Sequence, residues 1–223
     1  MEKQNLQSEL SVASTDKANL DKELISLVSM PTRLAEISSQ GVRQIACGSA
    51  HILALVDAGD VYAWGSGRSG QLGLGKQRSE PAPVLVWGLM RKGVRQIGAG
   101  AYHSAALTYN GYLYTWGSSS SGQLGHGNKR TQLQPKMVEA LEAEARERSS
   151  TVRLVGCGAR HTVAVLGNGE LYMWGKPDFG MLGRSKTETA TEPQLIEAMW
   201  RREVCGTWMG GGAQREGARR PIV

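Results

Sequence analysis

The chain has few cysteines and no long apolar segment. Its 223 residues include three cysteines, Cys47, Cys157 and Cys205. Their number is odd and none forms a C-x-x-C pair, which favours neither a zinc site nor a disulfide framework. No apolar run approaches the ~18 residues of a membrane span, and the N-terminus lacks the apolar core of a signal peptide. Free thiols are typical of a reducing compartment, so we expect the protein in the cytoplasm or the nucleus.

Phenylalanine and enzyme-like clusters are also scarce, whereas glycine is abundant. The chain has one Phe and 29 glycines, a composition typical of an all-β chain with many tight turns. Its net charge of +6 favours acidic partners but is too small to indicate a nucleic-acid-binding arm. No nucleophile–base pair, carboxylate pair or metal-ligand cluster emerges, so we predict no catalytic residue, metal or cofactor.

A repeat organises residues 31–202, with three complete units from residue 41 onward. GVRQIACGSAH starts at Gly41, GVRQIGAGAYH at Gly93 and TVRLVGCGARH at Thr151, giving units 41–92, 93–150 and 151–202. In each unit a histidine precedes a tryptophan by 13 residues, and a G-Q-L-G or G-M-L-G turn starts six residues after the tryptophan. We assign a structural role to all nine positions: His51, His103, His161, Trp64, Trp116, Trp174, Gly70, Gly122 and Gly180. Cys47 and Cys157 share one position, which we predict to be small and buried.

The repeat also explains a glycine motif that would otherwise indicate a nucleotide site. Gly65, Gly67 and Gly70 spell G-x-G-x-x-G after a short apolar run, as in a dinucleotide-binding fingerprint. Gly67 has no counterpart in the other units, and no helical pattern follows Gly70. Because a Rossmann site needs a helix N-terminus to hold the pyrophosphate, we interpret the motif as a turn of the repeat.

Each unit predicts four short strands. Apolar alternation marks the first three, and Ala-Gly or Asn-Gly between the second and third predicts a type I′ hairpin with positive φ at both central residues. We expect the fourth strand to begin at Pro83, Pro135 or Pro193, because proline suits the first position of a strand. Four strands in about 50 residues make one propeller blade. The predicted fold is therefore all-β, a partial β-propeller of about three four-stranded blades with a short N-terminal helix.

These units resemble the regulator of chromosome condensation repeat family. The resemblance rests on G-x-x-H before the second strand, on the L-Y-x-W-G strand and on the G-Q-L-G turn. It implies a β-propeller, seven-bladed in the best-known members, that acts as a protein-interaction or regulatory module without bond-making catalysis. It also implies an alternative, guanine-nucleotide exchange on a Ran-like small GTPase, although no exchange residue of the family can be matched to a position here. Chromatin association is a third interpretation.

Three units are too few to close a ring of roughly four to eight blades. The chain is then part of a larger propeller or a truncated product, or its copies complete each other, or another chain completes it. Residues 1–30 carry apolar residues at heptad spacing, typical of a short coiled coil or a lone amphipathic helix. The repeat fades after residue 202, so we expect 203–223 to be an irregular basic tail.

Loops on the repeat scaffold are the candidates for partner binding. A basic pair follows each turn: Lys76 and Arg78, Lys129 and Arg130, and Arg184 and Lys186. Their equivalent positions predict a basic arc on one face, suited to an acidic protein or a nucleic-acid backbone. Six extra residues after Pro135 predict a helix with Glu142 and Arg146 at i,i+4, a second candidate contact. Ordinary solvated surface is the alternative for both.

Overall fold

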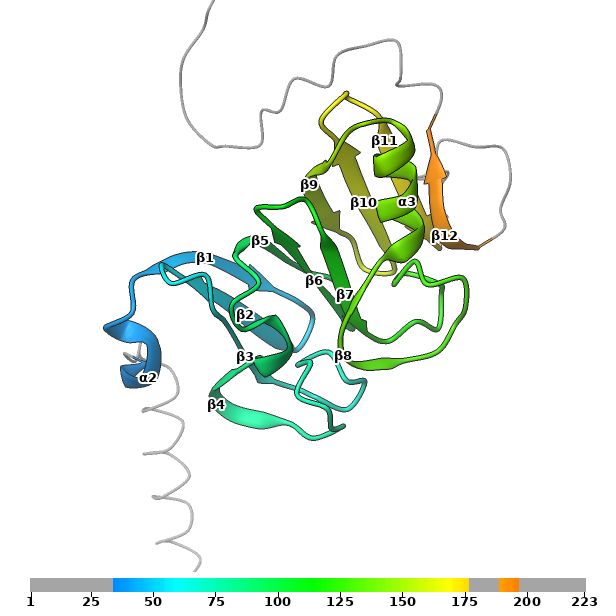
Figure 1. The fold of residues 1–223 in the computed structure, drawn as a ribbon. Helices are drawn as coiled ribbons and strands as arrows, with labels where there is room; N and C mark the ends of the chain where they lie inside the picture. The colour runs from blue at the N-terminus through cyan, green and yellow to red at the C-terminus, as the bar shows by residue number, and fades with distance from the viewer. Residues whose placement is uncertain (1–33, 177–188, 197–223) are drawn as a thin grey trace, which may run out of the picture. The chain divides into compact units, whose positions relative to one another are not determined.

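The computed structural model describes residues 34–176 and 189–196, and the sheets it contains confirm the predicted blades. Three four-stranded antiparallel sheets each follow chain order, so neighbouring strands in sequence are neighbours in the sheet (Figure 1). The first sheet holds β1 (Val42–Cys47), β2 (His51–Val56), β3 (Val61–Gly65) and β4 (Glu80–Leu85). The second holds β5 (Val94–Ala99), β6 (His103–Thr108), β7 (Leu113–Gly117) and β8 (Gln132–Met137). The third holds β9 (Val152–Cys157), β10 (His161–Leu166), β11 (Leu171–Gly175) and β12 (Ala190–Leu195).

Short helices make up the remaining regular structure of the described residues. The helix α2 (Ala35–Ser38) belongs to a compact unit of residues 1–41, and the sheets belong to a second unit of residues 42–223. Within the second unit, a 3₁₀ turn η1 (Trp87–Leu89) follows the first sheet and α3 (Glu139–Glu147) follows the second. The predictions for residues 1–30, Gly180, Arg184, Lys186 and 203–223 lie outside the described residues.

The hairpins between the second and third strands differ from the predicted type I′ turns. Gly111 has φ of 82° and donates to the Thr108 carbonyl, but Asn110 before it does not have a positive φ. The prediction of two positive φ angles is therefore wrong. Three residues, rather than two, separate the last paired residues, since Thr108 N bonds to Tyr112 O. In a three-residue loop, a type I turn followed by one left-handed glycine follows the twist of the strands equally well.

The fourth strands begin earlier than predicted. Pro83 is the fourth of the six residues of β4, and Pro135 and Pro193 occupy the same place in β8 and β12. Each of these strands is the last in its sheet, and the ladder next to β4 is irregular between Ala63 and Gly65. A proline inside the strand is tolerated there because an edge strand at an irregularity does not need its N–H for the ladder.

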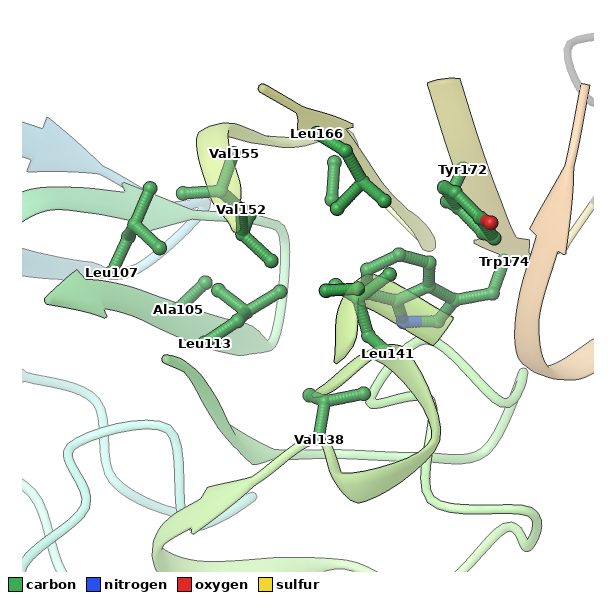
Figure 2. Packing of buried hydrophobic residues seen from close by; sticks show 12 residues of the cluster. Ala105, Leu107, Leu113, Val138, Leu141, Val152, Val155, Leu166, Tyr172 and Trp174 are labelled. Atoms are coloured by element: carbon green, nitrogen blue, oxygen red, sulfur yellow. The ribbon is translucent and has the colours of Figure 1, made fainter. Parts of the chain in front are cut away.

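The hydrophobic core lies between successive blades. One cluster joins Leu53 and Leu72 of the first blade to Ile97 and Trp116 of the second. A second cluster joins the second blade and α3 to the third blade, and in Figure 2 Leu141 lies against Trp174. This arrangement leaves one face of β1, the face that carries Val42 and Ile45, uncovered by any blade of the described residues.

The prediction that the shared cysteine position is buried is wrong for the first blade. Cys47, in β1, is exposed, because no described blade covers the face of β1 that is directed away from the second blade. Cys157, at the same position of the third unit, is half-buried, and its sulfur faces the second blade, where a Cβ on Gly98 would lie 3.0 Å away. Burial raises the pKa of the Cys157 thiol to about 12.

Candidate interaction surfaces

The G-Q-L-G turn of each blade is bonded to the tryptophan of the next blade. Trp116 Nε1 donates to the Gln71 carbonyl over 2.8 Å, and Trp174 Nε1 donates to the Gln123 carbonyl over 2.9 Å. The turn needs its glycines for this approach: Gly73 has φ of 74°, and a Cβ there would lie 2.8 Å from Trp116 Nε1. The repeated tryptophans and turns therefore fasten one blade to the next.

The repeated histidines form a second set of contacts between blades. His51 Nε2 lies 2.9 Å from Ser104 Oγ of the next blade, and His103 Nε2 lies 2.9 Å from Thr162 Oγ1. Both hydroxyls donate to the turn carbonyls that the tryptophans reach, so each Nε2 must carry the hydrogen and donate to the hydroxyl oxygen. Burial lowers the pKa of His51 to about 4 and that of His103 to about 3, so both are neutral at pH 7. Among the described residues, no group of three His, Cys, Asp or Glu side chains could hold a metal.

A glutamine in the first strand of the first and second blades makes a third set of contacts between blades, and it was not predicted from the sequence. Gln44 Nε2 donates to the Ile97 carbonyl over 2.9 Å, and Ile97 N donates to Gln44 Oε1 over 2.8 Å. Gln96 makes the same two bonds with Val155. Because β5 and β9 are edge strands of their sheets, a side-chain amide with both a donor and an acceptor satisfies backbone groups that lack a strand partner. We call this pair of bonds the carboxamide clamp. Leu154 replaces the glutamine in the third unit.

The predicted basic pairs lie in loops that are attached to the next blade. Gly75 N donates to the Leu133 carbonyl and Gly127 N to the Thr191 carbonyl, which fixes each loop along the outer strand of its neighbour. The basic side chains are exposed: Lys76, Arg78, Lys129 and Arg130. Lys76 Nζ lies 2.7 Å from Glu80 Oε1, so this ion pair offsets part of the charge of the first loop.

The predicted insertion helix is α3, and it is held on one side only. Leu141 and Ala145 are buried in the core between the second and third blades. Glu142 and Arg146 form an ion pair with each other, and Arg146 is exposed. The two proposed contact residues therefore lie on the helix surface and satisfy each other's charge.

The end of α3 is tied to the third blade by a partly exposed ionic cluster. Arg148 Nε lies 2.7 Å from Glu170 Oε2 and donates to the Tyr172 hydroxyl over 2.8 Å. The Tyr172 hydroxyl in turn donates to Glu144 Oε2, over 3.1 Å. Burial raises the pKa of Tyr172 to about 12, so the phenol stays protonated as this donor. These groups position the helix and leave no open site.

Exposed aromatic side chains gather at one end of the sheets, where the repeat is broken. Trp87 is 69% exposed, Tyr109 62% and Tyr112 40%. Trp87 lies in the connector after β4, and Tyr109 and Tyr112 lie in the β6–β7 hairpin. Tyr109 N donates to the carbonyl of Gly93, the residue at the end of that connector. The other units have acidic residues or glycine at these positions, for instance Glu139 in place of Trp87. This departure from the repeat was the sequence signal that reasoning from repeated positions passed over.

Two basic side chains lie in the same elements or bond to them. Arg43 Nη1 donates to the Tyr109 hydroxyl over 3.1 Å, and Arg43 Nε lies 3.8 Å from Asp57 Oδ1. Lys92, in the connector, has its Nζ 5.0 Å from the centre of the ring of Tyr114 in β7. We call Trp87, Tyr109, Tyr112, Arg43 and Lys92 together the aromatic edge. At the opposite end of the sheets, in the β5–β6 loop, the exposed aromatic side chain is that of Tyr102, at 50%.

Known proteins share this repeat. Two family models, both described as the regulator of chromosome condensation (RCC1) repeat, match residues 58–107 and 110–165, and residues 42–71, 94–123 and 152–180. The human E3 ubiquitin-protein ligase HERC2 is 40% identical over 182 residues, which are 80% of this chain and 4% of the ligase. The Arabidopsis thaliana ultraviolet-B receptor UVR8 is 36% identical over 158 residues, 71% of this chain and 34% of the receptor.

A solved structure shows the same fold. The crystal structure of human WBSCR16 is 26% identical, with a TM-score of 0.66, and the match covers 75% of this chain and 43% of that chain. The matched part of the chain therefore spans less than half of each of these proteins, from 4% to 43%. No helix among the described residues is long and apolar enough to cross a membrane.

Proposed function

Because this chain belongs to the regulator of chromosome condensation (RCC1) repeat family, we propose that it is a protein-interaction module whose docking surface is the aromatic edge. The observation that carries the proposal is the exposure of Trp87 and Tyr109 at positions where the other units have small or acidic residues. Tryptophan, tyrosine and arginine are the residues that most often dominate the binding energy of protein interfaces.

The repeated polar residues support this assignment because they already make hydrogen bonds between the blades. The buried tryptophans, histidines and glutamines bond to the neighbouring blade, which makes them scaffold rather than site. Partner recognition is then left to the loops that the scaffold holds. Arg43 and Lys92 beside the aromatic rings favour a partner segment with acidic side chains. We place this activity in the cytoplasm or the nucleus, which suits the free thiols of Cys47 and Cys157.

Two other functions stay open as proposals of lower rank. Exchange of guanine nucleotide on a Ran-like GTPase would involve the faces of several blades, and it predicts faster release of labelled GDP from the GTPase. Chromatin association through Lys76, Arg78, Lys129 and Arg130 predicts DNA binding that weakens steeply with salt. The docking proposal predicts neither effect.

The test compares two ends of the same sheets. The full chain and two variants serve as baits in cell extract, and bound proteins are quantified by mass spectrometry. Trp87→Ser/Tyr109→Ser alters the aromatic edge, and Tyr102→Ser is the control because it removes a half-exposed ring at the other end. We expect the first variant to lose partners that the wild type and the control retain. Identical partner sets for all three baits would refute the docking surface.

A further inference from the structure

The first blade has an apolar face that no blade of the described residues covers. Ile45 in β1 is 60% exposed, whereas its equivalents Ile97 and Val155 are 2% and 7% exposed. Val42 is 41% exposed, and its equivalent Val94 is fully buried. The second and third blades bury these positions against the blade before them, so the exposure in the first blade reflects a missing neighbour rather than a different sequence.

Polar groups on the same face are also left without their usual partners. Trp116 and Trp174 each donate to a turn carbonyl of the preceding blade, but the half-buried Trp64 has no acceptor within residues 34–176 and 189–196. Ile45 pairs with Ala54 in the same register in which Ile97 pairs with Ala106. Its N–H and C=O therefore point off the sheet edge as those of Ile97 do, and no carboxamide of the described chain clamps them.

We propose that this face, formed by Val42, Ile45, Ile52 and Trp64, docks a further blade of the same repeat type. The contact between blades occurs twice in the structure with the same bonds. A third contact of this kind at the first blade defines which residues the docked blade must carry. The occupant must carry a carboxamide to clamp Ile45 and a G-x-L-G turn whose carbonyl accepts the indole N–H of Trp64. This inference stands apart from the docking role of the aromatic edge.

The position of Ile52 adds a requirement for the occupant. Its equivalents are Ser104 and Thr162, whose hydroxyls bond to the histidine of the preceding blade. Ile52 has no hydroxyl, so a histidine placed against it would be buried without this bond. The occupant is therefore expected to have an apolar residue where the described blades have histidine.

A second copy of this chain does not meet these requirements. Its third blade would present Leu154 at the clamp position, and the backbone groups of Ile45 would be buried without partners. It would also bring His161 against Ile52. The proposed occupant is thus a blade with glutamine and an apolar residue at these two positions, and the third blade of the chain has neither.

The experiment builds the required chemistry into a donor and measures its binding to the wild-type chain. The donor is Leu154→Gln/His161→Leu, with Ile45→Glu added so that it does not bind itself. The comparison donor carries Ile45→Glu alone. Binding is followed by sedimentation velocity with labelled wild-type chain, and circular dichroism verifies that both donors fold. If His161→Leu prevents folding, the donor with Leu154→Gln and Ile45→Glu replaces it.

We expect the designed donor to bind the wild-type chain about 100-fold more tightly than the comparison donor, since two buried mismatches are removed. An acceptor with Ile45→Glu should not bind. Equal binding by both donors, lost on Ile45→Glu in the acceptor, would make a second copy the occupant and overturn the proposal. Failure of both donors to bind would overturn the rule that the clamp and turn direct docking.

Discussion

Replacing Gln96 with leucine should measure how much the carboxamide clamp between the second and third blades contributes to the free energy of unfolding. Leucine is nearly isosteric and already stands at this position in the third unit, as Leu154. The substitution removes two bonds to Val155, of 2.9 and 3.2 Å, and leaves a residue that is only 7% exposed with unpaired backbone groups. At about 1–3 kcal/mol for each of the two unsatisfied groups, offset by about 1 kcal/mol of added apolar burial, the loss lies between about 1 and 5 kcal/mol, and we expect about 3 kcal/mol.

The assay is thermal and urea unfolding of the full chain, followed by circular dichroism. For a chain of this size, the expected loss lowers the midpoint temperature by about 5–12 °C. Gln77→Leu is the control, because Gln77 is exposed in a loop and should change stability by less than about 0.5 kcal/mol. If Gln96→Leu is no more destabilising than Gln77→Leu, the clamp does not hold the blades together.

Three further results are expected. Stability should fall below pH 6.5 by up to about 1.4 kcal/mol per pH unit for each buried histidine, because His51 and His103 have their pKa lowered to about 4 and about 3 and only the unfolded chain takes up these protons; urea titrations at pH 7 and 5 that agree would contradict this. Gly73→Ala should cost about 2 kcal/mol or more, since its φ of 74° and the 2.8 Å approach to Trp116 both disfavour a Cβ; an unchanged unfolding curve would refute it. A thiol reagent at pH 8 should modify exposed Cys47 at least about 10-fold faster than Cys157, whose pKa is about 12, and equal rates measured by peptide mass spectrometry would count against the burial of that thiol.

The strands of the blades could be predicted because the repeat fixes each residue's place three times over. Apolar alternation and hairpin glycines recur in each unit, so errors at one unit are corrected by the others. Detail that depends on local geometry could not be predicted in the same way. The hairpin uses one left-handed glycine, at Gly111, and the outer strand continues through Pro83 because an edge strand tolerates a missing N–H.

The surfaces were harder to predict, since burial depends on what lies beside a blade. Cys47 and Cys157 share one repeat position, yet one is exposed and the other half-buried, because only the second has a described blade before it. The aromatic edge was missed for another reason. Its aromatic residues, such as Trp87, stand at positions where the other units have acidic residues or glycine, so the repeat pattern does not predict them.

Amide hydrogen exchange at three equivalent residues tests the central claim, that repeated residues join the blades and leave one blade face open to a partner. The account predicts slow exchange of the Ile97 and Val155 amides, which the glutamine clamps hold, and exchange at least about 100-fold faster for the Ile45 amide. Protection of Ile45 equal to that of Ile97 in the isolated chain would contradict the open face. Fast exchange at all three residues would contradict the clamp.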